Sequence, residues 1–82
     1  MSRNHWPYRL KDGRQTVYIG KTNDLDARAE EHRAEGKRFT RLLALGRAMT
    51  KDSALRREEE ALRAYRRTHH GRNPRYNLTR HG

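Results

Sequence analysis

The 82-residue sequence contains no cysteine, and this absence excludes two classes of structure. A disulfide framework and a thiolate metal site both require that residue. The sequence also lacks any stretch near the roughly 20 apolar residues that a membrane-spanning helix needs. Its opening residues, MSRNHWPYRL, contain no apolar run, so we expect no signal peptide. These absences favour a cytoplasmic protein that does not contact a membrane.

Acidic residues are scarce compared with basic ones. Twenty Lys and Arg face ten Asp and Glu, which gives a formal net charge of +10. Such an excess on a small domain favours a polyanionic partner, and the planar guanidinium of Arg matches phosphate oxygens. We therefore expect a nucleic acid as the partner. The alternatives are arginine-rich codon usage without such a partner, and an anionic membrane surface, which would need a basic helix with a broad apolar face.

The chain is short enough to form one domain with a modest core. We expect residues 1–82 to make up that single domain, with residues 1–5 and 79–82 flexible. The sequence shows no internal repeat that would indicate a second unit.

The stretch YRLKDGRQTVYIG predicts a β-hairpin. Tyr8–Leu10 and Thr16–Ile19 are β-prone, and an Asp-Gly turn signal lies between them. Pro7 should lie at the start or edge of the first strand, because proline cannot donate a hydrogen bond to a neighbouring strand. Gly20 is expected to end the second strand.

A first helix is predicted directly after the hairpin. The loop KTND offers Thr22, Asn23 or Asp24 as the N-cap. The helix should then run from about Leu25 to Glu35, and Gly36 should stop it.

The segment RFTRLLALGRAM is ambiguous, because a short apolar run fits a buried strand or a helix. Leu and Ala prefer helices. A lone hairpin is only marginally stable, however, and a third strand would give it a partner. We therefore expect a strand at about Thr40–Leu45.

The clearest helix begins after Thr50, its expected N-cap, and covers TKDSALRREEEALRAYRR. Acidic residues lie in its first turn and basic residues in its last, as the helix dipole favours. Its expected buried stripe consists of Ala54, Leu55, Ala61, Leu62 and Tyr65.

Arg28 and His32 lie four residues apart on the first predicted helix, so they share a face at the border of its apolar side. An Arg in that position can clamp a phosphate, and a His beside it can transfer a proton near neutral pH. The alternative is an ordinary solvated basic face, which a chain rich in Lys and Arg forms by chance.

Glu58 lies in the middle of the expected apolar stripe of the second helix. Burying a carboxylate is costly unless it is paired or bound to a metal. A hard cation such as Mg²⁺ would suit it, because Mg²⁺ keeps several waters and needs few protein oxygens. The alternatives are a partly exposed Glu58 paired with an Arg such as Arg28, and metal binding at Glu59 instead.

Tyr8 and Tyr18 lie on the paired strands of the predicted hairpin. Tyr is often a core residue whose hydroxyl reaches water. A phenol near Lys21 and Arg28 would have its pKa lowered from about 10 and could help to deprotonate water.

The remaining candidates carry weaker signals. Asn77 is a lone Asn in an irregular tail, where Asn commonly forms turns. It is a candidate for substrate binding together with Lys21 and Arg72. His69 and the next histidine are candidates for phosphate contact. Trp6 fits the core, with base stacking as the alternative.

Together these residues resemble the GIY-YIG nuclease superfamily, and the resemblance covers nearly the whole chain. The segment VYIG contains YIG, the second half of the motif that gives the family its name, and its tyrosine is Tyr18. WPYRL keeps Tyr8 where the family has the Tyr of GIY, whereas Trp6 and Pro7 replace the Gly and Ile. The ten-residue step between the two tyrosines is similar to that of the family.

Four further residues match the family in order. Arg28 in DLDARAEEH matches the conserved Arg, and His32 matches the His or Tyr position that follows it. Glu58 matches the metal-binding Glu of the last helix. Asn77 in RYNL matches the closing Asn.

The resemblance implies an α+β fold with a small three-stranded antiparallel sheet flanked by helices. It also implies a metal-dependent endonuclease that hydrolyses phosphodiester bonds, in DNA rather than RNA. Glu58 would then hold Mg²⁺ or Mn²⁺ against the scissile phosphate.

The same resemblance implies a role for each remaining site residue. Arg28 would stabilise the charge that builds on the phosphate. Tyr8, with His32 or Lys21, would orient or deprotonate the attacking water. Tyr18 would contact phosphate or complete the proton path, and Asn77 would hold the tail against the site, which is a structural role.

Two other functions fit the sequence. One is a basic nucleic-acid-binding module that has lost catalysis and needs no metal. The other is the nuclease domain of a larger toxin. Either way, we expect weak sequence preference, or a partner domain or a dimer that supplies target choice, because the chain has almost no insertions beyond the residues that match the family.

Overall fold

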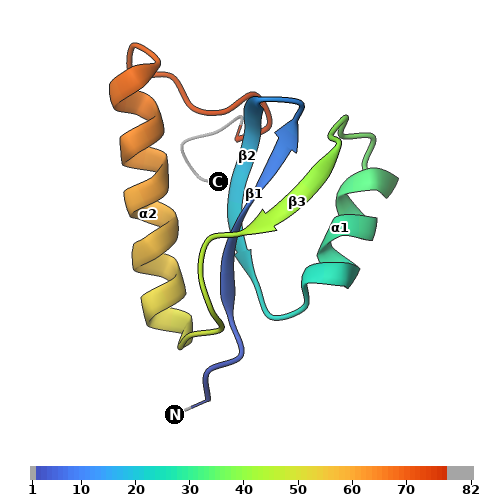
Figure 1. The fold of residues 1–82 in the computed structure, drawn as a ribbon, viewed down its shortest axis with the longest axis vertical. Coiled ribbons are helices and arrows are strands. Elements are labelled where there is room, and N and C mark those ends of the chain that lie inside the picture. The colour runs from blue at the N-terminus through green and yellow to red at the C-terminus, as the bar shows by residue number, and fades with distance from the viewer. Residues whose placement is uncertain (1, 78–82) are drawn as a thin grey trace.

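The computed structural model describes residues 2–77. Figure 1 shows a three-stranded sheet with one helix on each side of it. The elements in chain order are β1 (Trp6–Asp12), β2 (Gln15–Thr22), α1 (Leu25–Ala34), β3 (Arg41–Ala44) and α2 (Lys51–Thr68). The expectation for residues 79–82 falls outside this described range.

The sheet is antiparallel, with the strand order β2-β1-β3. This order confirms the predicted α+β fold with a three-stranded antiparallel sheet flanked by helices. It also resolves the ambiguous apolar segment as a strand, since β3 pairs with β1 and places Leu42 opposite Leu10 and Leu43 opposite Arg9. The segment before β1 is bonded to the segment before α2, because His5 and Met49 exchange two backbone hydrogen bonds of 3.0 and 2.7 Å.

The hairpin forms as predicted, but its strands are longer. Gly13 takes a φ of +62° in the turn, a conformation that glycine adopts without steric cost. The prediction that Gly20 ends the second strand is wrong, because β2 continues to Thr22. Pro7 lies near the start of β1, although β1 is the central strand. The carbonyl of Pro7 accepts a hydrogen bond from the backbone N–H of Leu45 at 2.7 Å.

Helix α1 begins after Asp24, whose side chain accepts a hydrogen bond from the backbone N–H of Ala27 at 3.0 Å. The cap is itself fixed, because the Asp24 N–H donates to the Thr22 hydroxyl at 3.1 Å. Gly36 follows the helix with a φ of +87°, as expected of a stop residue. His32 is the buried residue of this helix, so α1 contributes a polar ring where most helices contribute an apolar side chain.

Helix α2 begins after Thr50, whose hydroxyl accepts from the Ser53 N–H at 3.2 Å. Ala54 is its buried residue. Leu55 is 39% exposed, so its predicted place in the buried stripe is wrong. The buried side of the helix instead passes through Ala54 and half-buried Glu58 and continues to three further half-buried residues, Ala61, Leu62 and Tyr65. None of the helices in the described range is long and apolar enough to cross a membrane.

The core centres on Tyr8, Leu10 and Val17. The segment after α2 closes the free edge of the sheet beside this core. The backbone N–H of Tyr76 donates to Val17 at 2.8 Å. The side-chain amide of Asn77 accepts from the Ile19 N–H and donates to the Ile19 carbonyl, both at 2.9 Å. Trp6 is half-buried at the start of β1.

Candidate functional site

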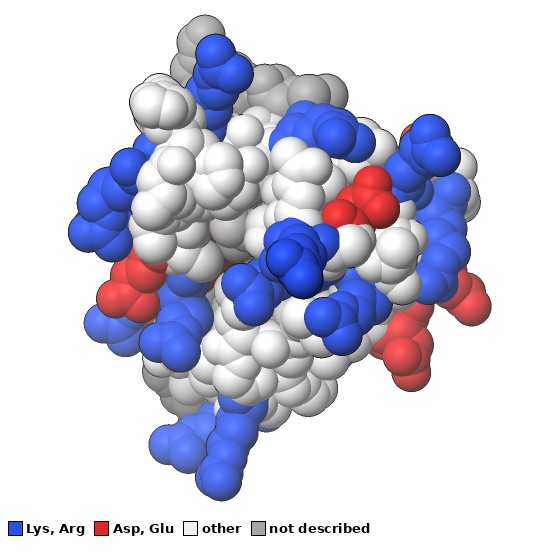
Figure 2. Space-filling model, turned by 45° about the horizontal axis from the view of Figure 1, so that its top comes forward, with Lys and Arg blue, Asp and Glu red and all other residues white. Residues whose placement is uncertain are grey.

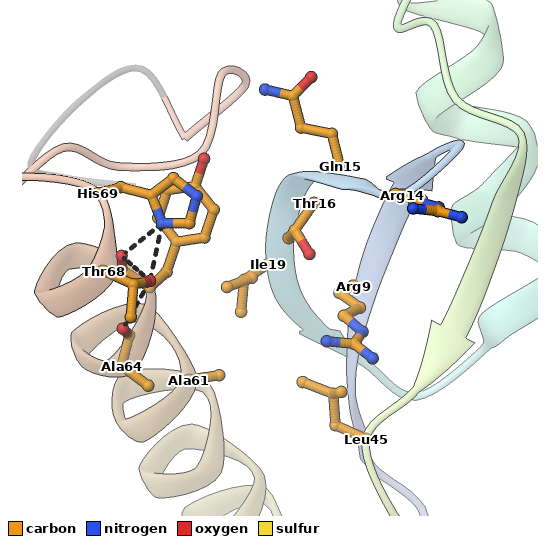
Figure 3. A pocket seen from close by; sticks show the side chains of 11 residues that line it. Arg9, Arg14, Gln15, Thr16, Ile19, Leu45, Ala61, Ala64, Thr68 and His69 are labelled. Carbon is orange, nitrogen blue, oxygen red and sulfur yellow. Dashed lines mark hydrogen bonds between the residues drawn. The ribbon is translucent and has the colours of Figure 1, made fainter.

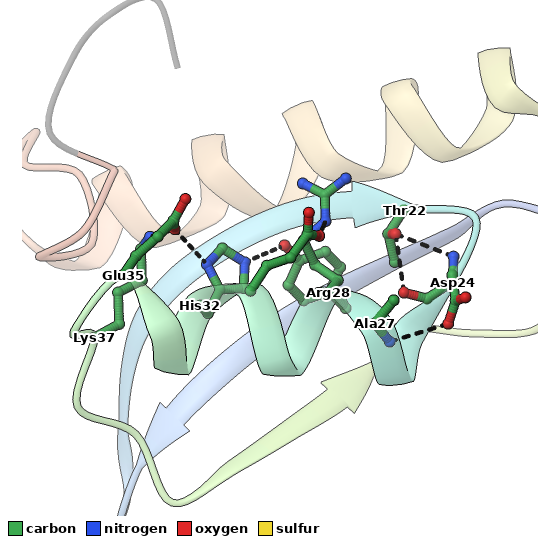
Figure 4. Close-up of polar contacts among 9 residues, drawn as sticks. Thr22, Asp24, Ala27, Arg28, His32, Glu35 and Lys37 are labelled. Carbon is green, nitrogen blue, oxygen red and sulfur yellow. Dashed lines mark hydrogen bonds and ion pairs between the residues drawn. The ribbon is translucent and has the colours of Figure 1, made fainter.

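A hydrogen bond between Tyr8 and His32 connects the central strand to α1. The Tyr8 hydroxyl lies 2.7 Å from Nε2 of His32. Figure 4 labels His32 and marks this hydrogen bond with a dashed line. Tyr8 is 0% exposed and His32 is 3% exposed. Both groups are buried away from water, so each supplies the hydrogen-bond partner that the other needs.

The environment of His32 favours a neutral ring. Burial is the main cause that lowers the pKa of His32 below 6.5, and the nearby Lys37 ammonium lowers it further. Nδ1 lies 3.6 Å from a carboxylate oxygen of Glu35, which also binds Lys37 at 2.6 Å. A proton on Nδ1 therefore faces negative charge, which leaves Nε2 to accept a hydrogen bond from the Tyr8 hydroxyl.

Tyr8 does not have the acidic phenol that its basic neighbours suggested. Burial raises its pKa strongly, with Tyr18 and Glu58 adding to the effect, whereas Arg28 acts in the opposite direction. The prediction of a lowered pKa is thus wrong for Tyr8, because desolvation of a phenolate outweighs one half-exposed guanidinium. Tyr8 stays protonated at neutral pH and can give up its proton only to a neighbour that accepts it directly.

Tyr18 lies beside both members of this pair. Its ring centroid is 6.0 Å from that of Tyr8 and 4.7 Å from that of His32. Unlike Tyr8, it is half-buried. We call Tyr8, Tyr18 and His32 the tyrosine–histidine cluster.

Gly20 makes this close packing possible. A Cβ atom at that position would lie 2.7 Å from Cε2 of Tyr18 and 3.0 Å from the hydroxyl oxygen of Tyr8. This role of Gly20 was not predicted from the sequence. The signal was present in the hairpin register, which places Gly20 opposite Tyr8 and two residues after Tyr18 on the same strand face.

Arg28 lies one helical turn before His32 on α1. Its side chain extends over the sheet in the direction of α2 (Figure 4) and is 38% exposed. Its Nε lies 3.0 Å from a carboxylate oxygen of Glu31. The charge of Arg28 lowers the pKa of both Tyr8 and His32, so it is close enough to act on the tyrosine–histidine cluster electrostatically.

Glu58 approaches the same cluster from α2. Burial raises the pKa of this half-buried carboxyl, and the Lys21 ammonium opposes that effect. Its charge also raises the pKa of Tyr8. Within residues 2–77 it forms no ion pair, and Arg28 pairs with Glu31 rather than with Glu58. Glu59 is exposed, so Glu58 is the better placed of the two candidate metal ligands.

The residues around Glu58 fit a cation that needs few protein ligands. Within the described part of the chain, no group of three or more His, Asp or Glu side chains converges as a metal cage would require. Glu58 is instead a single partly desolvated carboxylate that forms no ion pair within residues 2–77, although the charge of Lys21 lowers its pKa. This arrangement suits Mg²⁺, which commonly binds through one or two carboxylates together with waters and substrate phosphates.

The other candidates are placed differently. Lys21 shares a small cavity with Arg28. Asn77 is buried and bonded to β2, so its observed contacts are structural. Arg72 lies exposed in the turn after α2, and the cluster contacts described above do not include it. His69 stacks on Tyr65 with a centroid distance of 3.6 Å.

A larger cavity than the one beside Arg28 lies elsewhere, between the sheet and α2. It has a volume of about 500 Å³, and Ile19, Leu45 and Ala61 are among its lining residues. Figure 3 shows these small or aliphatic side chains along the space between the helix and the strands. None of the tyrosine–histidine cluster lines it.

The surface of the structure carries the excess of basic side chains that the net charge of +10 predicts (Figure 2). On the face shown in Figure 2, Lys and Arg side chains are spread over most regions, and Asp and Glu are fewer. A surface of this kind attracts polyanions over a distance of about one Debye length, roughly 8–10 Å at physiological salt.

Comparison with known proteins finds no family model that matches the chain, no matching curated protein and no matching solved structure.

Proposed function

We propose that this protein is a small metal-dependent endonuclease of the GIY-YIG type that hydrolyses phosphodiester bonds in DNA. The observation that carries the proposal is the 2.7 Å hydrogen bond between buried Tyr8 and His32, with the charges of Arg28 and Glu58 acting on Tyr8 from the two helices. These are the residues on which the sequence resemblance rests. The net charge of +10 supports a polyanionic substrate.

The proton path begins at Tyr18 because Tyr8 has no exposed surface. Half-buried Tyr18 is the phenol that an attacking water would meet first, and its ring centroid lies 6.0 Å from that of Tyr8. A proton from water would pass to Tyr18 as the Tyr18 proton passes to Tyr8 and the Tyr8 proton to Nε2 of His32. The neutral state of His32 makes it the acceptor at the end of this path.

Arg28 supplies positive charge where negative charge develops on the phosphate. Its side chain is partly exposed and already directed over the cluster, so little reorganisation is needed when a strand binds. Glu58 would hold Mg²⁺ or Mn²⁺. A bound divalent cation of this kind polarises the phosphoryl oxygens and stabilises the leaving oxygen.

Cleavage of end-labelled oligonucleotides tests the proposal. Single-stranded and double-stranded DNA and RNA are incubated with the protein, with Mg²⁺ in one series and with a chelator in the other. We expect DNA fragments with Mg²⁺ and none with chelator. Binding of DNA without fragments under any condition would favour the non-catalytic nucleic-acid-binding module instead, and the same preparation of a Glu58→Gln variant controls for contaminating nucleases.

A further inference from the structure

A small cavity lies next to Arg28, on the side where the first residue of α2 approaches the end of β2. Its volume is about 220 Å³, below the roughly 300–1,000 Å³ of cavities that enclose a drug-sized or nucleotide-sized ligand. It can therefore accept one compact group rather than a whole nucleotide. The residues that line it are His5, Lys21, Thr22, Asn23, Arg28 and Lys51, and we call it the basic pocket.

The charged residues that line the basic pocket are all cationic. Lys21, Arg28 and Lys51 bring three cations to it, and no Asp or Glu is among its lining residues. Arg28 is partly balanced by Glu31 at 3.0 Å, and the Lys21 ammonium is close enough to Glu58 to lower its pKa. Lys51 forms no ion pair within residues 2–77. Gathering like charges costs free energy, which an anion in the pocket would recover.

The walls of the pocket come from separate parts of the chain that are held in place. The paired backbone bonds between His5 and Met49 fix the N-terminal segment beside the start of α2. On the opposite wall, the Thr22 hydroxyl bonds to the backbone of Asp24. Lys51 thus approaches Lys21 and Arg28 because of the fold and not because of proximity in sequence.

We propose that the basic pocket holds a second backbone phosphate of the bound strand, next to the scissile one, and that Lys51 is its principal contact. This inference rests on the proposed function for the position of the scissile phosphate at Arg28. A phosphate held in this way positions the strand in the ground state and in the transition state alike. Its loss should therefore weaken binding and raise KM while kcat stays the same.

The test is the salt dependence of binding, measured with chelator present so that cleavage cannot enter the result. A fluorescent single-stranded oligothymidine is titrated with wild type and Lys51→Gln between 50 and 200 mM salt. Removing one phosphate contact should reduce the slope of log K against log salt by about 0.7. Lys51→Arg should keep the wild-type slope, because it retains the charge.

Lys11→Gln is the matched control. Lys11 lies on β1 at the turn end of the hairpin, where its amine donates to the Arg14 carbonyl at 2.7 Å, and it does not line the basic pocket. Both Gln variants lose the same formal charge, so Lys11→Gln should leave the slope unchanged. Equal slopes for Lys51→Gln and Lys11→Gln would overturn the proposal.

Steady-state cleavage with Mg²⁺ separates this inference from the proposed function. If wild type cleaves and Lys51→Gln lowers kcat as strongly as kcat/KM, Lys51 acts on the scissile phosphate and the second-phosphate assignment is wrong. If wild type binds the oligonucleotide without cleaving it, the proposed function fails. The loss of slope in Lys51→Gln would then still identify a phosphate site.

Discussion

The two sides of the sheet differ in what they enclose. Towards α1, Tyr8 and His32 are buried against one another with a hydrogen bond of 2.7 Å. Towards α2, a cavity of about 500 Å³ is lined by aliphatic and small side chains such as Ile19 and Ala61 together with polar ones such as Arg9. None of the tyrosine–histidine cluster lines that cavity. The proposed function therefore rests on buried polar groups with shifted pKa values and not on the volume of a cavity.

The first way to test this comparison is to neutralise the carboxylate beside the cluster. Glu58→Gln should reduce Mg²⁺-dependent cleavage to background, because the amide is a poor ligand for a hard cation. The same change should raise the melting temperature at pH 7, because burial disfavours the charged form of Glu58.

Glu59→Gln is the matched control for that change, since Glu59 is adjacent and exposed. It should cleave like wild type and melt at nearly the same temperature. Loss of cleavage in Glu59→Gln with activity kept in Glu58→Gln would move the metal site by one residue.

A methyl group at Gly20 should disturb the packed side of the sheet. In Gly20→Ala the new Cβ would meet the rings of Tyr18 and Tyr8, and overpacking of this kind costs about 1–3 kcal/mol. We expect a fall in melting temperature of about 4–8 °C for each kcal/mol, together with reduced cleavage. Thermal unfolding followed by circular dichroism measures the first effect. An unchanged melting temperature would show that the rings are loosely held.

The pH dependence follows from the lowered pKa of His32. The proposed proton path needs neutral His32 as its acceptor, so we expect kcat/KM to stay level as the pH falls to 6.5 and to decrease only below it. The free energy of unfolding should also decrease as the pH falls, because the unfolded chain binds a proton at His32 more readily than the folded chain does. The stabilisation is therefore complete above pH 6.5 and is lost as the pH falls through the folded pKa.

His32→Gln provides the comparison for the pH effect. Its melting temperature should change less between pH 7.5 and pH 5 than that of wild type. Identical pH profiles of stability for the two proteins would contradict a buried neutral imidazole.

The smallest effect on cleavage should come from filling the large cavity. Ala61→Leu places extra methyl groups into the space between α2 and the sheet, and cavity filling commonly adds about 0.5–2 kcal/mol of stability. Cleavage should stay at the wild-type rate. A large loss of cleavage in a variant that folds normally would mean that this cavity takes part in the site.

Local sequence signals predicted the secondary structure because each depends on neighbouring residues. The Asp-Gly turn, the Thr50 cap and the Gly36 stop appear where such signals place them, and Asp24 is the one of three predicted N-cap candidates that begins α1. The third strand needed a tertiary argument, namely that a hairpin requires a partner. Leu55 was misplaced because the buried side of α2 runs through Ala54 and Glu58, and Leu55 lies about 100° further round the helix from Ala54.

The site itself was predictable only in part. Spacing alone placed Arg28 and His32 on one face of a helix. The pairing of His32 with Tyr8, 24 residues earlier, depends on how α1 packs on the sheet, which no local pattern specifies. The pKa of Tyr8 could not be deduced either, because burial decides it and burial is a property of the whole fold.

The most direct test of the account is the rate of DNA cleavage by Arg28→Ala compared with that by Arg63→Ala. Both variants lose one guanidinium, and Arg63 is exposed on α2. If the tyrosine–histidine cluster with Arg28 and Glu58 hydrolyses phosphodiesters, Arg28→Ala should lower kcat by about 10²–10³-fold, while Arg63→Ala retains the wild-type rate. Equal rates in the two variants, from protein free of contaminating nuclease, would contradict it.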